Sequence, residues 1–253
     1  MSKRLRLSIA ITIIVTVIAV AATLFATQYV GSLEPATCLS DHCFCEEPSD
    51  SGLVQIVNSF TSLAFVIVGV WGLLVASRLK PARLEKRLIG VFAAVAVFIG
   101  LSSFFYHGTL TFLGQFLDIF SMYVFGTLLI LGALLRRGYV KPVIGIVLFI
   151  AVNIALGYVQ YVYPDSRRIL FALILIPGII LEFVPIGKPG YDRKYLYLGI
   201  MSLIVAYGIW SLDQNGILCW PDSVLQGHGL WHILTAVAVG MVMLHYRRTG
   251  KEL

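Results

Sequence analysis

Long apolar runs alternate with short polar segments along the whole chain. A helix needs roughly 20 mainly apolar residues to cross the hydrocarbon core of a bilayer. We expect helices because backbone polar groups in lipid must be paired within the spanning segment. The predicted spans are Leu7–Val30, Leu53–Ser77, Leu88–His107, Phe112–Leu135, Pro142–Tyr163, Ile169–Pro185, Tyr195–Leu212 and Val224–His245. The predicted fold class is therefore all-α, a polytopic transmembrane helical bundle.

Lysine and arginine concentrate in every second connecting segment. If the N-terminus is cytoplasmic, all of the 19 basic residues except Arg167 and Arg168 fall on the cytoplasmic side. This asymmetry is what the positive-inside rule describes, and it predicts that both termini are cytoplasmic. The net charge of +6 then reflects topology and contact with anionic lipid. We therefore expect no nucleic-acid partner.

The composition supports a single membrane domain. The chain is 58% hydrophobic and 13% charged, whereas about a quarter of the residues in a soluble domain are charged. Residues 1–30 begin with a basic stretch before an apolar run, as a secretory signal peptide does. This run is longer than the roughly 7–15 apolar residues of a signal peptide. We predict an uncleaved signal anchor over residues 1–30 and a membrane domain over residues 31–253, with cleavage as the alternative.

All four cysteines, Cys38, Cys43, Cys45 and Cys219, fall in predicted outer loops. An oxidising compartment permits disulfides there. Four cysteines allow three pairings, and the spacing alone does not choose among them. A zinc site built from these thiols is the alternative.

Five polar side chains from three predicted spans share one depth near the outer face. His107 ends the third span, and Ser103 lies one turn earlier on the same face. Asp118 lies in the first turns of the fourth span, and His228 and His232 lie in the first turns of the eighth. Ionisable residues within spans are costly and usually mark function. By contrast, we expect Asp213 to be solvated or capped at the outer boundary, with support of the metal site as the alternative. We expect Glu182, near the inner end of its span, to snorkel or to pair locally.

The three histidines predict a metal site. His228 and His232 are four residues apart and so share a helix face. Together with His107 they offer three imidazoles and leave an open position, which is the arrangement of catalytic zinc. The alternatives are histidines that only pack or hydrogen-bond between helices, and a bis-histidine haem site.

Several ordered motifs resemble those of the alkaline ceramidase family. They are SFFYH (Ser103–His107), DIFSM (Asp118–Met122), WSLD (Trp210–Asp213) and QGHGLWHILT (Gln226–Thr235). The resemblance runs from about Cys43 to the end. The same superfamily contains adiponectin-type receptors and lipid-remodelling hydrolases.

The resemblance implies a seven-helix core, preceded here by one extra helix, and an amidase that acts on ceramides. It also implies zinc on His107, His228 and His232. Ser103 and Asp118 would carry the remaining active-site roles. Cys45 and Cys219 occupy the positions of a family disulfide.

The calcium motif of the family is largely missing. Phe44–Glu46 matches a W-C-E element, and Glu46 remains as a candidate calcium ligand. Cys43 and Pro48 stand where the family has Asp and Asn, and Gln55 stands near a family Glu. The sequence therefore predicts zinc but gives no support for calcium dependence.

The hypothesis that follows is metal-assisted hydrolysis of a ceramide-like lipid near the non-cytoplasmic face. Asp118 would act as general base and then acid, and Ser103 would hydrogen-bond the developing oxyanion. Two alternatives use the same three histidines. One is a lipid-remodelling esterase, and the other is a sensor of the adiponectin-receptor kind.

Overall fold

Helices make up most of the chain that the computed structural model describes, residues 3–39, 43–80, 83–184 and 193–252. Within these residues the only extended pairing is an isolated bridge between Pro35 and Thr111, so the predicted all-α fold class is confirmed. In chain order the helices are α1 (Lys3–Ala26), the 3-10 helix η1 (Thr27–Ser32), α2 (Ile56–Ser62), α3 (Ala64–Ser77), α4 (Leu84–Thr109), α5 (Phe112–Arg136), α6 (Pro142–Val162), the 3-10 helix η3 (Pro164–Ser166), α7 (Arg167–Phe183), α8 (Lys194–Gln214) and α9 (Gly227–Glu252).

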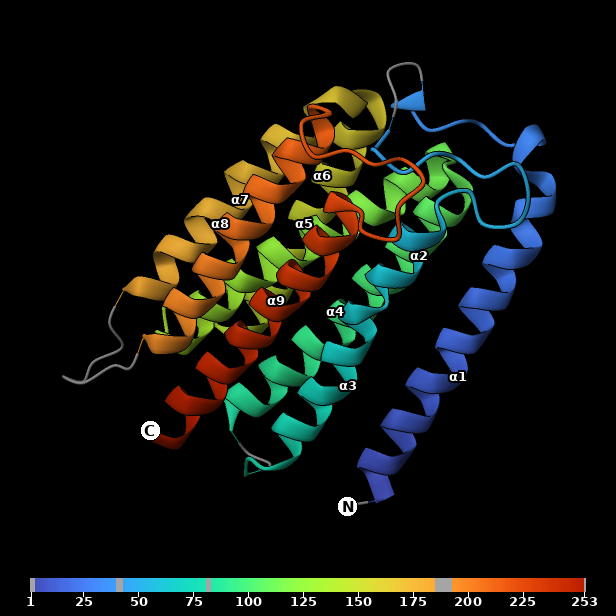
Figure 1. Ribbon diagram of the computed structural model, residues 1–253. Helices are drawn as coiled ribbons and strands as arrows, with labels where there is room; N and C mark the ends of the chain where they lie inside the picture. Colours follow the sequence, from blue (N-terminus) through green and yellow to red (C-terminus); the bar gives the residue numbers. More distant parts are fainter. Residues whose placement is uncertain (1–2, 40–42, 81–82, 185–192, 253) are drawn as a thin grey trace.

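Seven helical segments in the described residues are long and apolar enough to cross a membrane, which indicates a multi-pass membrane protein. Eight spans were predicted, and the one that is not among these seven is α7, which has 17 residues with Pro177 inside it. This is shorter than the roughly 20 residues that a full crossing needs, although α7 lies alongside the other helices (Figure 1). The predicted second span is divided at Leu63 into α2 and α3.

Helix α4 forms the centre of the bundle. It packs against α1, α2, α3, α5 and α9, and its Ile89 and Phe92 belong to the main apolar core together with Met243 and Tyr246 of α9. Small residues let the backbones approach closely, as is common between membrane helices. A Cβ atom on Gly69 of α3 would lie 2.7 Å from the backbone oxygen of Ala93.

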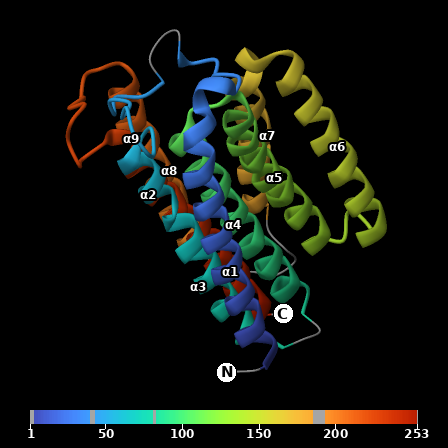
Figure 2. The same cartoon turned by 90° about the vertical axis from the view of Figure 1, so that its right-hand side faces the viewer.

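Helices α1 and α6 lie at the periphery of the bundle (Figures 1 and 2). Their outward faces are apolar, with exposed side chains such as Ile14 and Ile18 on α1 and Ile146 and Ile154 on α6. Apolar surface on this scale would be unfavourable in water. It is what a helix in contact with lipid requires.

A tight turn joins α4 to α5 and fixes the relation between their functional residues. Leu110 ends α4 in the left-handed region, with φ of 44°. The Thr111 hydroxyl caps α5 by accepting from the Gly114 amide at 3.2 Å, an interaction typical of helix N-termini. The loop after η1 crosses over this turn, because the Ala36 amide donates to the Leu110 carbonyl at 2.9 Å.

Candidate metal centre

Three buried histidines meet at one end of the bundle. His107 lies in the last turn of α4, and His228 and His232 lie in the first turns of α9. Their candidate ligand nitrogens all lie within 4.8 Å of one another, so the group could hold a metal ion. Nε2 of His107 and Nε2 of His228 are 3.2 Å apart. Two nitrogens bound to one tetrahedral zinc ion at about 2.0–2.1 Å would be separated by roughly 3.3 Å.

Polar side chains contact the Nδ1 atoms of two of these rings and thereby orient them. The Gln55 side chain donates through Nε2 to the Glu46 carbonyl at 3.1 Å, which turns its Oε1 toward His107. That oxygen lies 2.8 Å from His107 Nδ1. Thr61 Oγ1 lies 3.1 Å from His232 Nδ1. Such partners keep the proton on Nδ1 and leave Nε2 free to bind a metal, as is usual around metal-ligating histidines. The donor set therefore fits a metal ion.

His228 is positioned differently, through its backbone. Asp213, at the end of α8, accepts from the His228 amide at 3.3 Å and from the Cys45 amide at 3.4 Å. It thereby satisfies an amide at the start of α9 and links it to the N-terminal loop. Among the described residues, Nδ1 of His228 has no hydrogen-bond partner. Asp213 is therefore buried and hydrogen-bonded rather than solvated, and it contacts the backbone of a histidine of the site.

Ser103 and Asp118 lie beside the histidines. Ser103 Oγ is 3.4 Å from His232 Nε2, and Ser103 and Asp118 line one cavity together with His228 and His232. Asp118 comes from α5, so a third helix contributes a side chain to this group. The structure thus brings together all five side chains that the sequence placed at one depth.

Phe44 covers the histidine group on the side of the N-terminal loop. Its ring centroid lies 3.9 Å from that of His228 and 4.9 Å from that of His107. Disulfides hold both of its neighbours, Cys43 to Cys38 and Cys45 to Cys219. The second pair is the one that the family resemblance implied. Together the two bonds fix the loop over the site.

Glu46 is engaged with backbone rather than exposed as an open ligand. Its two carboxylate oxygens accept from the Val57 amide at 2.6 Å and the Asn58 amide at 2.8 Å, at the start of α2. Burial raises the pKa of Glu46 above its usual value, against the opposing effect of these amides. The carboxylate acts as a cap for α2, and both of its oxygens already have partners.

A largely apolar cavity of about 710 Å³ leads from the histidines into the bundle. Ser103, Asp118, His228 and His232 line its polar end, and Glu182 lines it at the other end. Its walls come from α4, α5, α7, α8 and α9. Because α7 packs on α5 and α8 packs on α9, the cavity lies between these two helix pairs. Its volume is within the range of known ligand sites, about 300–1,000 Å³.

Comparison with known proteins identifies the family. The ceramidase family matches residues 37–252, which is most of the chain. This chain belongs to the ceramidase family. The match begins after α1 and η1, and it contains every residue of the histidine site.

Three relatives carry ceramidase names. A putative alkaline ceramidase of Dictyostelium discoideum is 23% identical over 229 residues, covering 74% of this chain and 77% of the relative. The alkaline ceramidase of Drosophila melanogaster is 24% identical over 222 residues, covering 84% and 77%. An alkaline ceramidase of Saccharomyces cerevisiae is 27% identical over 216 residues, covering 72% and 67%.

In this ceramidase-family chain, sequence reasoning missed the residues that support the histidines. Thr61 was not predicted to have a functional role, and Phe44 and Gln55 were considered only as part of the incomplete calcium motif. Gln55 does carry a usable signal, since a buried glutamine next to an apolar span needs hydrogen-bond partners. Its partner could not be named from the sequence, because His107 is 52 residues away.

Glu182 forms a buried polar cluster at the far end of the cavity. Its carboxylate is paired with Arg136, accepts from the Tyr246 hydroxyl at 2.6 Å and lies 3.6 Å from His245 Nε2. The guanidinium of Arg136 also lies 3.8 Å from the centre of the Tyr246 ring. Local pairing of Glu182 was expected, but burial of the whole cluster was not.

Proposed function

We propose that this chain is a membrane hydrolase that cleaves the amide bond of ceramide-like N-acyl lipids and releases a fatty acid and a sphingoid base. The observation that carries the proposal is the buried group of His107, His228 and His232, with Ser103 and Asp118 beside it, at the polar end of an apolar cavity. The family and the names of the relatives support the choice of ceramide as substrate.

We further propose that the three histidines hold zinc. A bound zinc ion supplies Lewis acidity toward a carbonyl oxygen and a water molecule. Imidazole also suits copper, iron and nickel, but the site contains no thiolate or redox partner group among its described residues. Zinc is therefore the assignment that best matches hydrolysis.

In the proposed mechanism Asp118 and Ser103 handle the proton and the developing charge. The Asp118 carboxylate takes a proton from the attacking water and later delivers it to the leaving nitrogen, as general base and then acid. The Ser103 hydroxyl, whose oxygen lies 3.4 Å from His232 Nε2, donates its proton to the oxyanion as it forms. Burial excludes bulk water and strengthens both interactions.

The orientation in the membrane is also a proposal. The distribution of basic residues supports cytoplasmic termini and a histidine site toward the non-cytoplasmic face. Residues 1–30 would then act as a signal anchor, and residues 31–253 would form the catalytic domain. A lipid substrate would keep its amide at the polar end of the cavity and its chain among the apolar walls.

The experiment is metal analysis and lipid hydrolysis on the purified protein and three variants. We expect His228→Ala to lose both bound zinc and ceramide hydrolysis, and Asp118→Asn to lose hydrolysis by about 10²–10⁴-fold while zinc is kept. His245→Ala, the matched control at the other end of the cavity, should keep its zinc. If His228→Ala kept zinc and hydrolysis, the proposal would be wrong.

The same assay separates the alternative functions. Turnover of a phosphoglyceride instead of ceramide would indicate an esterase. Bound metal with no turnover of either lipid would indicate a sensor.

A further inference from the structure

Two arginines at the start of α7 line the same cavity as the histidines. Arg167 and Arg168 are the first two residues of that helix, and both belong to the cavity wall. In the predicted topology they are also the only basic residues on the non-cytoplasmic side. Basic residues are disfavoured in short outer loops, so a pair of them at this place calls for a specific role.

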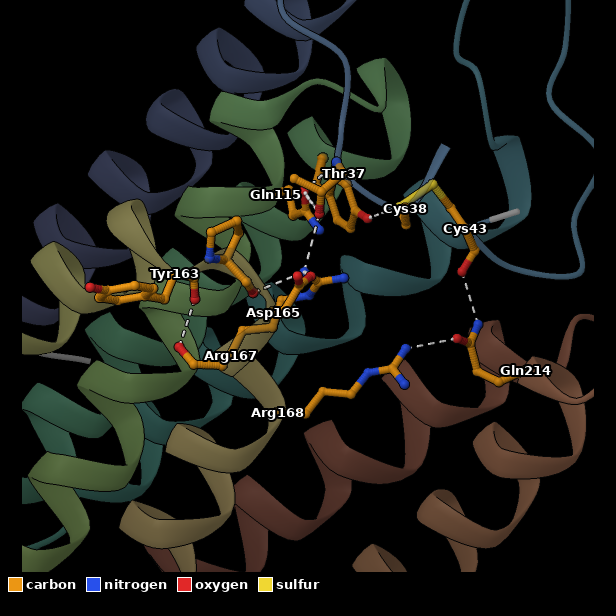
Figure 3. A network of polar contacts seen from close by, with 12 residues as sticks. Thr37, Cys38, Cys43, Gln115, Tyr163, Asp165, Arg167, Arg168 and Gln214 are labelled. Atoms are coloured by element: carbon orange, nitrogen blue, oxygen red, sulfur yellow. Dashed lines mark hydrogen bonds and ion pairs between the residues drawn. A yellow bond between two sulfur atoms is a disulfide. The ribbon is translucent and has the colours of Figure 1, made fainter. Parts of the chain in front are cut away.

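The hydrogen bonds that hold both side chains in place go to neutral partners (Figure 3). Arg167 Nη1 donates to Thr37 Oγ1 at 3.1 Å and to the Pro164 carbonyl at 2.9 Å. Arg168 Nη2 donates to Gln214 Oε1 at 3.1 Å, and the guanidinium lies 4.9 Å from the centre of the Trp210 ring. Within the described residues, these contacts leave the other nitrogens of both guanidinium groups without a protein acceptor.

These partners also connect the arginines to the loop above the site. Thr37 donates to Gln115 Oε1 through its amide at 2.9 Å. Gln214 donates through Nε2 to the Cys43 carbonyl at 2.9 Å. Thr37 directly precedes Cys38, and Gln214 contacts Cys43, so both partners lie next to the Cys38–Cys43 disulfide (Figure 3). The guanidinium groups are therefore pre-positioned at the rim of the cavity.

The positive charge at this rim is only weakly compensated. The ion-pair partner of Arg167 is Asp165, at 3.6 Å, and its side chain is 99% exposed. Exposed ion pairs are screened by water and salt and contribute little. Among the described residues that line the cavity, Asp118 is the acidic one at this end. The N-terminal end of a helix adds further positive potential.

We propose that Arg167 and Arg168 bind the anionic group of a lipid whose apolar chain occupies the cavity. Arginine is suited to this because its planar fork binds carboxylates and phosphates through paired hydrogen bonds. The group is a carboxylate or a phosphate. The carboxylate would come from the released fatty acid, a source that rests on the proposed amide hydrolysis, and the phosphate would come from a lipid headgroup.

Charge complementarity gives the site a function in turnover. Ceramide is uncharged, whereas the fatty acid released by its hydrolysis carries a carboxylate. That carboxylate forms next to Asp118, which repels it, and the rim arginines attract it. The arginine pair would therefore hold the product at the outer rim after cleavage, and free fatty acid would inhibit the enzyme.

Binding of two matched probes tests the proposal without relying on catalysis. Oleate and oleyl alcohol share one apolar chain and differ in charge, and both can be titrated against the full chain in nanodiscs of uncharged lipid. We expect the double variant Arg167→Gln/Arg168→Gln to weaken oleate binding by about tenfold or more and to leave oleyl alcohol binding unchanged. The double variant Arg167→Lys/Arg168→Lys keeps the positive charges but not the paired donors of arginine, so it should weaken oleate binding by a smaller factor.

Two further variants control for charge alone. Lys141→Gln removes one positive charge at the other end of the bundle, next to α6, and should leave the binding of both probes unchanged. Asp165→Asn removes the exposed acidic neighbour and should tighten oleate binding. If the double glutamine variant bound oleate as the wild type does, or lost both probes equally, the proposal would be overturned.

Hydrolysis assays then distinguish the two sources of the anion. If oleate inhibits hydrolysis of uncharged ceramide by the wild type but not by the double glutamine variant, the bound anion is the carboxylate of the product. A selective loss of kcat/KM for a phosphorylated ceramide would indicate a headgroup phosphate. If no ceramide were hydrolysed at all but oleate binding still depended on the arginines, the proposed function would fail while this site would stand.

Discussion

Gln55 Oε1 lies 2.8 Å from His107 Nδ1, and both residues are buried. The glutamine is held in turn by the Glu46 carbonyl, so the contact links the N-terminal loop to the last turn of α4. Loss of an outer hydrogen-bond partner typically lowers metal affinity by about 10–100-fold. We therefore expect Gln55→Ala to weaken zinc binding by about this factor.

A zinc competition titration against a chelator measures that effect. Gln55→Glu keeps an acceptor at the same place and serves as the conservative variant, so it should retain most of the affinity. Unchanged affinity in Gln55→Ala would show that the glutamine does not orient the ligand.

The two disulfides should differ in their effect on stability. In the chain-entropy view a disulfide stabilises more when it closes a longer loop, by about 5 kcal/mol for the separation of 174 between Cys45 and Cys219 and by about 2 kcal/mol for the separation of 5 between Cys38 and Cys43. We expect Cys45→Ser/Cys219→Ser to lower the thermal unfolding midpoint more than Cys38→Ser/Cys43→Ser. An equal decrease in the two variants would contradict this ranking.

Glu182 should be the most sensitive acidic residue for stability. It lies buried against Arg136 and Tyr246, and removal of one partner from a buried ion pair typically costs about 3–5 kcal/mol because a charge is left uncompensated. We expect Glu182→Ala to destabilise the protein by about this amount in a denaturation experiment. Glu34→Ala, at an exposed acidic residue, is the control and should have little effect.

The length of the cavity should limit the length of the lipid chain. Arg168 and Glu182 both line it, and their separation of 14 positions along α7 corresponds to about 21 Å at about 1.5 Å per residue. One leaflet of the hydrocarbon core is about 15 Å thick, so a full acyl chain fits. Ile179→Trp, on the cavity wall, should shift hydrolysis toward ceramides with shorter acyl chains.

Ile180→Trp provides the matched control for that prediction. Ile180 is the neighbouring residue on the same helix, but its side chain is 59% exposed and faces away from the core. It should keep the wild-type preference. The same shift in both variants, or in neither, would show that the cavity does not hold the acyl chain.

The sequence predicted the helices well because a membrane span is a local property. An apolar run of sufficient length defines it regardless of tertiary contacts. The break at Leu63 was not predictable, since no proline or glycine marks it. The bounds of α7 were predicted two residues too late, at Ile169–Pro185, whereas the helix runs from Arg167 to Phe183 and has the same 17 residues. Pro185 itself lies outside the described residues.

The candidate site was predictable to the extent that topology fixes depth. His107, His228, His232, Ser103 and Asp118 were placed together because they come from the same ends of their spans. Gln55, Thr61 and Phe44 reach the histidines from a loop and a short helix, whose path depends on two disulfides. Because this loop has no periodic sequence pattern, the contacts of these three residues with the histidines cannot be predicted from the sequence.

Metal removal and reconstitution tests the central claim most directly. The purified protein would be stripped with a chelator, titrated with zinc and assayed for ceramide hydrolysis at each step. The account predicts that hydrolysis is lost on stripping and returns in proportion to zinc, up to one ion per chain, and that the triple variant His107→Ala/His228→Ala/His232→Ala binds none. Full ceramide hydrolysis by the metal-free protein would contradict it.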